Sequence, residues 1–306
     1  MRLAPGLLLI AAFLAGPAAA QDTFTYSYDG YTAELPLHPQ RVFVLDSRTG
    51  LDFAASAGFP IIATDWDPED HSHLEAYVPR EAARIAFRNE PNAEFVLAQN
   101  PDLLVVGEGW WNYWRENSMF DSGTLPVLVV KDGSAADWRE LFSGQMAAYG
   151  LAERADQLLA EYDDAVAEAK PVVEAALAGR KVAITDVWGA DSVALQVNTF
   201  TTAVAADLGI TTIVGTAEQT DDGYQIYSPE NLDVFRDAAL VMSLWTADIA
   251  ENPLWQRIPA VARGAQYEMD VANSWGFALT ATDLVHDFEK AMSLLETADA
   301  REKAAQ

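Results

Sequence analysis

Cysteine is missing from all 306 residues of the chain. Its absence excludes disulfide bonds and thiolate-ligated metal sites. It also removes the residue through which many exported bacterial proteins carry a lipid anchor. A chain of this length is usually too long to fold around one small hydrophobic core, so we expect two lobes.

Catalytic motifs are missing as well. The chain has four histidines and contains no G-x-S-x-G, P-loop or H-E-x-x-H sequence. Because no nucleophile and base can be assigned, we predict that the protein is not an enzyme and needs no cofactor. An α/β enzyme is the alternative that this pattern disfavours.

Histidines occur close together at one place only. His71 and His73 lie near four acidic residues that could complete a zinc or manganese site, namely Asp65, Asp67, Glu69 and Asp70. Two histidines in a polar loop are more often simply solvated. A metal-binding protein using His71 and His73 therefore stays as an alternative interpretation.

Apolar stretches long enough to span a bilayer are also missing. The beginning of the chain has Arg2, a short apolar run over 7–14 and small residues at 18–20, which is the pattern of a cleaved signal peptide rather than a membrane anchor. We expect cleavage after about Ala20. An exported chain without a lipid anchor stays near its membrane only if an outer membrane confines it, so the sequence predicts a periplasmic protein.

Basic residues are few. There are 19 Lys and Arg against 46 Asp and Glu, which gives a net charge of −27. Such a surface repels nucleic acid and anionic lipid, and it disfavours anionic ligands unless a local basic pocket overrides it. Adaptation to a salty habitat is the alternative explanation.

A strand–helix pattern occurs twice. A basic residue, an apolar run and Asp46 occupy 41–46, and the same order returns at 181–186, ending in Asp186. A helical segment follows each copy (51–58 and 202–209), and then a second strand (60–63 and 211–214). Gly58 and Gly209 suit the left-handed end of each helix. A second pattern, a helix start followed by a buried strand, occupies 92–106 and 228–242.

This repeat predicts an α/β fold of two Rossmann-like lobes with parallel sheets. Between the copies, apolar residues at helical spacing over 151–166 predict a long helix that continues past Pro171 with a kink. We therefore divide the chain into a signal peptide (1–20), an N-terminal lobe (21–143), an interlobe helix (144–178) and a C-terminal lobe (179–306). A single helical connection should allow only small closing motions.

Tryptophan gathers at the predicted strand ends, where ligands of parallel α/β sheets bind. Six of the nine tryptophans follow a strand directly: Trp66, Trp110, Trp111, Trp188, Trp245 and Trp275. Their number favours an aromatic-lined cleft over ordinary packing. Arg48 and Arg88 also follow strands and could donate hydrogen bonds to ligand oxygens.

Three segments of the chain resemble a known family: 39–46 (PQRVFVLD), 87–94 (FRNEPNAE) and 253–261 (PLWQRIPAV) followed by Arg263 and Gly264. They are similar to segments of the periplasmic binding proteins of iron-siderophore and vitamin B12 ABC transporters, and within that family to the ferric hydroxamate binders. The resemblance covers essentially the whole chain after the signal peptide. It implies two helix-bridged lobes that hold a ferric complex in a shallow aromatic cleft.

The resemblance also implies roles for particular residues. Arg88 falls where the family has an arginine reaching the iron-bound oxygens, and Trp110 falls near a binding-site tyrosine whose hydroxyl this chain lacks. The ligand-binding set predicted from the strand ends and the resemblance is Arg48, Trp66, Arg88, Trp110, Trp111, Tyr113, Trp188, Tyr224, Trp245, Asn273 and Trp275. Asn273 stands in place of an aromatic residue. The iron is held by the siderophore and not by the protein.

Two glutamates occupy equivalent places in the two copies. Glu94 and Glu230 each lie in the first turn of a predicted helix, where an acid is also stabilised by the helix dipole. The resemblance implies that they pair with arginines on the dimeric permease of the ABC transporter. We expect the binding protein itself to be a monomer.

The charge of the chain bears on the ligand. A tris-hydroxamate ferric complex is nearly neutral, whereas a tris-catecholate complex carries about three negative charges, which the acidic surface would repel. Hydroxamate or mixed-type siderophores are therefore favoured. Haem and corrinoids are the main alternatives, because tryptophans would also stack on a tetrapyrrole.

Overall fold

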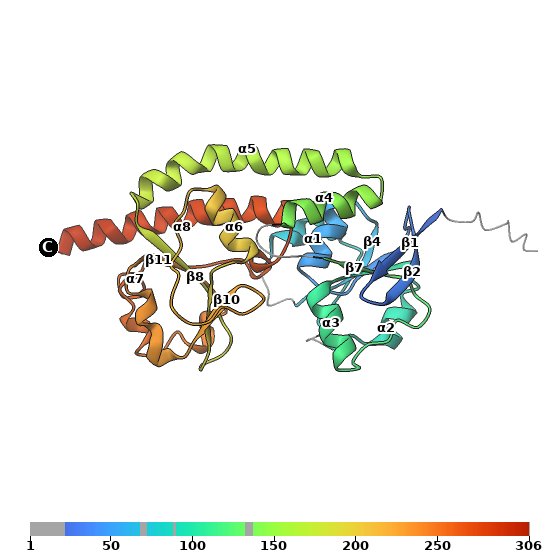
Figure 1. The fold of residues 1–306 in the computed structure, drawn as a ribbon, viewed down its shortest axis with the longest axis horizontal. Helices are drawn as coiled ribbons and strands as arrows, with labels where there is room; N and C mark the ends of the chain where they lie inside the picture. Colours follow the sequence, from blue (N-terminus) through green and yellow to red (C-terminus); the bar gives the residue numbers. More distant parts are fainter. Residues whose placement is uncertain (1–21, 68–71, 88–89, 132–136, 306) are drawn as a thin grey trace, which may run out of the picture.

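A computed structural model describes residues 22–67, 72–87, 90–131 and 137–305. The predicted signal peptide, Arg88 and His71 lie outside the described residues. Figure 1 shows two lobes side by side, with the long helix α5 lying along one side of both. Within the described part of the chain, none of the helices has the length and apolar character needed to cross a bilayer.

The first lobe contains a five-stranded sheet in the order β5-β4-β3-β6-β7, with every neighbouring pair parallel. A β-hairpin, β1 and β2, precedes it. The strands are β1 (Thr23–Tyr28), β2 (Tyr31–Pro36), β3 (Val42–Val44), β4 (Ile61–Asp65), β5 (Ala83–Ile85), β6 (Leu103–Gly107) and β7 (Val127–Val130). The helices are α1 (Thr49–Ser56), the 3-10 turn η1 (His73–Tyr77), α2 (Ala93–Ala98), α3 (Glu108–Glu116) and α4 (Trp138–Ala148).

The second lobe contains another five-stranded sheet, in the order β10-β9-β8-β11-β12. Its strands are β8 (Lys181–Val187), β9 (Val193–Gln196), β10 (Tyr224–Tyr227), β11 (Ala238–Leu244) and β12 (Gln266–Glu268). Its helices are α6 (Phe200–Asp207), α7 (Pro259–Ala262), α8 (Ala278–Ala305) and the 3-10 turns η2 (Pro229–Phe235), η3 (Thr246–Asp248), η4 (Trp255–Arg257) and η5 (Val271–Ser274).

The second sheet is mixed, in contrast to the parallel sheet expected. β8, β11 and β12 are parallel, but β9 is antiparallel to both β8 and β10. A connection of only a few residues joins β8 to β9, and so short a connection can return the chain only in the antiparallel direction. The parallel strand predicted at 211–214 is reduced to a single bridge between Val182 and Thr212.

The internal repeat is confirmed by strand pairing. β3 pairs with β6 in the first sheet, with Val42 opposite Leu103, and β8 pairs with β11 in the second, with Val182 opposite Leu240. Both pairs lie at the centre of their sheets, where strands are covered on both faces and read as continuous apolar runs. The sequence pattern was visible because nearly every residue of these four strands is buried.

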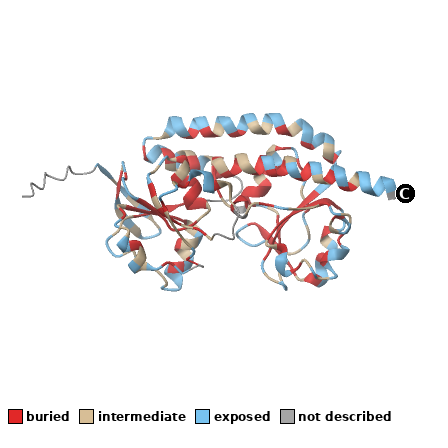
Figure 2. Cartoon of the chain, turned by 180° about the vertical axis from the view of Figure 1, so that it is seen from behind, coloured by how far each residue is buried: buried red, intermediate tan, exposed pale blue. Residues whose placement is uncertain are grey.

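Helix α5 (Ala152–Leu177) has 26 residues, so at 1.5 Å per residue it is about 39 Å long. It continues through Pro171, and Figure 1 shows it bending toward the second lobe near its end. Its buried residues, which include Leu158, Tyr162 and Val173, face the lobes, and Figure 2 shows exposed residues along its outer side. Helix α8 packs beside α5. The sequence pattern predicts one helix between the lobes and does not include α8 in that connection.

One apolar core continues from the first lobe through α5 and α8 into the second lobe. Phe277, just before α8, makes ring contacts with Phe53 of α1 at 6.2 Å and with Phe142 of α4 at 5.3 Å. A core shared in this way resists large hinge motions, because close-packed interiors do not deform continuously. A second, smaller core lies between the first sheet and α3.

Candidate functional site

A pocket of about 270 Å³ opens at the carboxyl ends of β3 and β6. Seven of its lining residues belong to the first lobe and one, Trp275, belongs to the second. The lining is Asp46, Arg48, Thr49, Gly107, Gly109, Trp110, Tyr113 and Trp275. The pocket therefore lies where ligands of parallel α/β sheets bind, and both lobes contribute to it.

Asp46 organises the floor of this pocket. Its carboxylate, only 1% exposed, accepts backbone hydrogen bonds from Arg48 and Gly50 at the start of α1 and from Gly107 at the end of β6. Burial raises the pKa of the Asp46 carboxyl, against the opposing effect of these N–H donors. A Cβ at Gly50 would stand 2.3 Å from the Asp46 carboxylate, so only glycine fits there.

Helix α3 begins directly after β6 and sorts its aromatic residues onto two faces. Trp110 and Tyr113, three residues apart, share the pocket side, and their rings meet edge to face at 6.0 Å. Trp111 and Trp114 turn inward and are buried at 6% and 2% exposure. Trp111 packs against Tyr31 of the hairpin. The helix therefore assigns Trp110 and Tyr113 to the pocket and Trp111 to the core.

Arg48 joins the two lobes at the pocket edge. Its guanidinium carbon lies 5.2 Å from the ring centre of Trp245 and 5.0 Å from that of Trp275, both in the second lobe. The two indoles lie 6.1 Å apart at 31°. Cation–π contacts of this kind use the flat face of guanidinium, whereas its N–H bonds point outward in the plane. Stacking on the two indoles therefore holds the N–H donors of the Arg48 guanidinium in a defined orientation beside the pocket.

The other predicted ligand residues lie away from the pocket lining. Trp66 is 5% exposed and belongs to the main core, because β4 is covered on both faces. Tyr224, the first residue of β10, is 3% exposed and pairs at 5.1 Å with the half-exposed Trp188, which follows β8. Asn273 is fully buried and donates to Asp287 at 2.8 Å.

Four lining residues were not predicted as ligand residues: Asp46, Thr49, Gly107 and Gly109. Asp46 ends the first copy of the repeat, and this position at a strand end was the signal that could have drawn attention to it. The glycines expose backbone at the pocket wall, and a Cβ at Gly107 would lie 3.1 Å from the Thr49 side chain. These glycines shape the pocket by leaving room rather than by offering a side chain, so no ligand-binding side chain marks them in the sequence.

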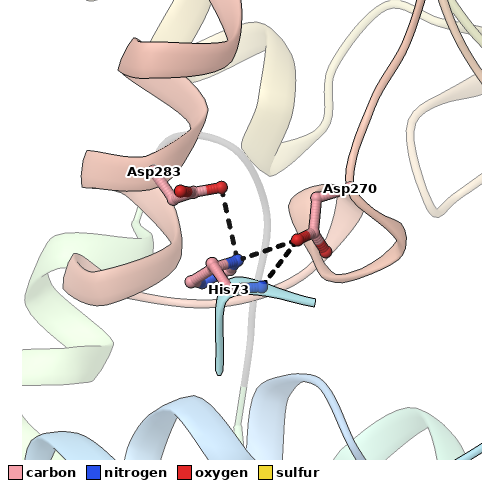
Figure 3. Close-up of side chains that lie close together, drawn as sticks. All are labelled: His73, Asp270 and Asp283. Atoms are coloured by element: carbon pink, nitrogen blue, oxygen red, sulfur yellow. Dashed lines mark hydrogen bonds and ion pairs between the residues drawn. The ribbon is translucent and has the colours of Figure 1, made fainter. Parts of the chain in front are cut away.

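A separate cluster contains His73, Asp270 and Asp283, shown in Figure 3. His73 Nδ1 lies 3.5 Å from Asp270 Oδ2 and 3.4 Å from Asp283 Oδ2. Burial lowers the pKa of His73, but the two carboxylates outweigh burial and raise it overall. Burial raises the pKa of Asp283, and the charge of His73 opposes this. The carboxylates predicted around His73 were its sequence neighbours, whereas Asp270 and Asp283 come from the second lobe.

Glu94 and Glu230 both have exposed side chains in first turns. Glu94 lies in α2, which Asn92 caps by accepting a hydrogen bond from the Phe95 N–H at 2.9 Å. Glu230 lies in η2, where Pro229 occupies the first turn, but Ser228 makes no side-chain capping bond there. The two elements precede β6 and β11, so the glutamates occupy equivalent places in the lobes.

Comparison with known proteins gives a consistent result. A family model described as "Periplasmic binding protein" matches residues 51–272. The iron(3+)-hydroxamate-binding protein FhuD of Bacillus subtilis is 25% identical over 267 residues, covering 84% of this chain and 82% of that protein.

Solved structures with the same fold include a siderophore-binding protein FhuD of Vibrio cholerae bound to ferric Desferal. Its TM-score is 0.63 at 20% identity, covering 84% of this chain and 98% of the other. A periplasmic component of a ferrichrome ABC transporter from Bacillus subtilis gives a TM-score of 0.66 at 19% identity, covering 87% and 99%. At these identities the structures establish the two-lobed fold.

Proposed function

The chain belongs to the periplasmic binding protein family, and on this premise we propose that it captures a ferric siderophore of hydroxamate or mixed type and delivers it to an ABC importer. Members of this family are binding components of transport and not enzymes, in agreement with the prediction from the missing catalytic motifs. Membership also implies an exported protein. Cleavage after about Ala20 and release into a periplasm without a lipid anchor are part of the proposal.

The observation that carries the proposal is the position of Arg48 between Trp245 and Trp275, beside a pocket that also contains Trp110 and Tyr113. A ferric hydroxamate presents iron-bound oxygens, which accept hydrogen bonds, and apolar linkers, which pack on aromatic rings. Guanidinium donors next to indole faces match both properties. Arg88 is proposed as a second donor on the strength of the resemblance.

Charge favours a nearly neutral complex over a trianionic one. Among the described residues that line the pocket, Arg48 is the single basic side chain, and the acidic Asp46 lies in the floor. The chain as a whole carries −27. A trianionic catecholate complex would need several clustered arginines to offset this field. The Bacillus subtilis relative is named for iron(3+)-hydroxamate binding, which supports the same ligand class.

Ligand titration with tryptophan fluorescence tests the proposal. Ferric desferrioxamine should quench the emission at sub-micromolar concentration, whereas a ferric tris-catecholate, haemin and cobalamin should not at that level. Iron-free desferrioxamine serves as the control for the bare chelator. Saturable binding of haemin or cobalamin in place of the hydroxamate would make the protein a tetrapyrrole binder, and no response to any ligand would refute the proposal.

Matched variants place the ligand in the pocket. Trp275→Leu and Arg48→Gln should each weaken ferric hydroxamate binding about tenfold or more, as expected for the loss of a desolvated stacking or charged contact. Tyr77→Leu and Arg236→Gln change an exposed aromatic residue and an exposed arginine outside the pocket lining and should leave the affinity unchanged. Equal losses in both pairs would place the ligand elsewhere.

A further inference from the structure

The His73 cluster joins the two lobes at a place distinct from the ligand pocket. His73 begins η1 in the first lobe, Asp270 follows β12 in the second, and Asp283 lies in the first turns of α8. Their donor atoms all fall within 4.8 Å of one another, and Figure 3 shows the imidazole facing both carboxylates. None of the three lines the pocket that contains Arg48.

The spacing of these atoms suits a shared cation better than hydrogen bonds. His73 Nδ1 is 3.5 and 3.4 Å from the two carboxylate oxygens, beyond the usual 2.7–3.2 Å of an N–H···O bond. In a tetrahedral zinc site with bonds of about 2.0–2.2 Å, neighbouring donor atoms lie about 3.3–3.6 Å apart. The two separations from His73 Nδ1 equal that edge length, and the three donor atoms all lie within 4.8 Å of one another.

The imidazole is also left unsatisfied by protein groups. Both ring nitrogens of His73 are buried, and within the described part of the chain neither has a well-aligned hydrogen-bond partner. The side chain is only 12% exposed. Buried polar nitrogens without partners are rare and point to a missing ligand. The backbone N–H of His73 meanwhile donates to Asp270 Oδ2 at 2.6 Å, which fixes that carboxylate against the ring.

The charges of the acidic residues around His73 also favour a bound cation. Asp287 is neutralised by Lys290 at 2.9 Å, and Asp52 accepts backbone hydrogen bonds from Phe277 and Thr280. Asp270 and Asp283 therefore share His73 between them. One dication with a neutral imidazole and two carboxylates would bring this partly buried cluster to neutrality, which lowers the cost of holding its charges away from water.

We propose that His73 Nδ1 and the carboxylates of Asp270 and Asp283 bind one Zn²⁺ ion, with water as the fourth ligand, and that this ion fastens the two lobes together. Asp270 Oδ1 also accepts the Ala272 N–H at 2.9 Å at the start of η5, the segment that leads to Trp275. The ion would thus fix the position of a pocket residue relative to the first lobe. It is a structural site and not the transported cargo.

Zinc content tests this directly and needs no siderophore. Protein stripped with EDTA, incubated with Zn²⁺ and desalted should retain one zinc per chain, and its melting temperature should rise relative to the stripped form. Co²⁺ in its place should give the strong visible absorption of a four-coordinate site. His73→Gln and Asp283→Asn should each lose the retained zinc, the temperature rise and the cobalt spectrum.

His286→Gln is the matched control. His286 lies on the same helix α8, also next to a carboxylate (Glu289, 3.2 Å), but its side chain is 54% exposed. This variant should keep one zinc per chain. Far-UV circular dichroism of the stripped variants shows whether they are folded. Wild-type protein that retains no zinc, or His73→Gln and Asp283→Asn variants that are folded and retain as much as wild type, would overturn the proposal.

Discussion

Asp52 Oδ2 accepts a hydrogen bond from the backbone N–H of Thr280 at 3.0 Å, across 228 residues of sequence. The same oxygen accepts from Phe277 N–H at 2.8 Å, and Asp52 Oδ1 accepts from Ser56 at 3.0 Å. A fully buried carboxylate of α1 in the first lobe therefore caps α8, which packs on the second. Exposed N–H groups at a helix start need such an acceptor, and its negative charge suits the helix dipole.

Removing this charge should loosen the connection between the lobes. Asp52→Ala, which removes the acceptor as well as its charge, is expected to lower the free energy of unfolding by about 1–2 kcal/mol, the usual value of a helix cap. Urea denaturation followed by circular dichroism measures the change. Asp233→Ala alters an 84% exposed carboxylate and should change stability by less than about 0.5 kcal/mol. Equal effects of the two substitutions would contradict a capping role.

Gly276 makes room for the same contact. A Cβ at this position would stand 2.4 Å from Thr280 Oγ1 and 2.9 Å from Asp52 Oδ2. Gly276→Ala should therefore destabilise the protein by about 1–3 kcal/mol, as overpacking does. Gly144→Ala, in the middle of α4 with open space around it, should instead stabilise by about 0.5–1 kcal/mol. Thermal denaturation of both variants distinguishes close packing from a general effect of replacing glycine.

The paired glutamates should act on transport and not on ligand binding. Glu94→Lys combined with Glu230→Lys should abolish ferric siderophore uptake in cells, because two ion pairs with the permease would become repulsive. Affinity for the ferric ligand, measured on the purified protein, should be unchanged. Glu153→Lys reverses an exposed first-turn glutamate of α5, on the opposite side of the molecule from α2 in Figure 1, and should leave uptake intact. Full uptake by the double variant would remove the docking role.

Asp299 should contribute stability that depends on pH. A hydrogen bond from Arg180, with the added charge of Arg263 at 2.8 Å, lowers the pKa of its carboxyl. A carboxyl whose pKa is lower in the folded state stabilises the protein above its unfolded pKa of about 3.9, and this contribution is lost as pH falls through the folded value. Melting temperature measured between neutral pH and pH 3 should therefore fall less steeply in Asp299→Asn than in wild type. An unchanged slope would show that the ion pair contributes nothing.

The sequence by itself determined the repeat and the central strands. β3, β6, β8 and β11 are buried on both faces, so their apolar runs could be read without knowing their partners. The long helix was also predictable, because its apolar face repeats at helical spacing, and Gly58 and Gly209 do adopt the left-handed conformation expected at helix ends. These features depend on residues close together in the chain.

Only the tertiary structure decided which aromatic residues face the pocket. Trp110 and Trp111 are neighbours in sequence, yet α3 turns by about 100° per residue and sends one to the pocket and the other to the core. The same holds for His73, whose buried partners come from the other lobe, and for Asp52 at the start of α8. Contacts between distant segments depend on how the lobes dock, and no local pattern in the sequence encodes that docking.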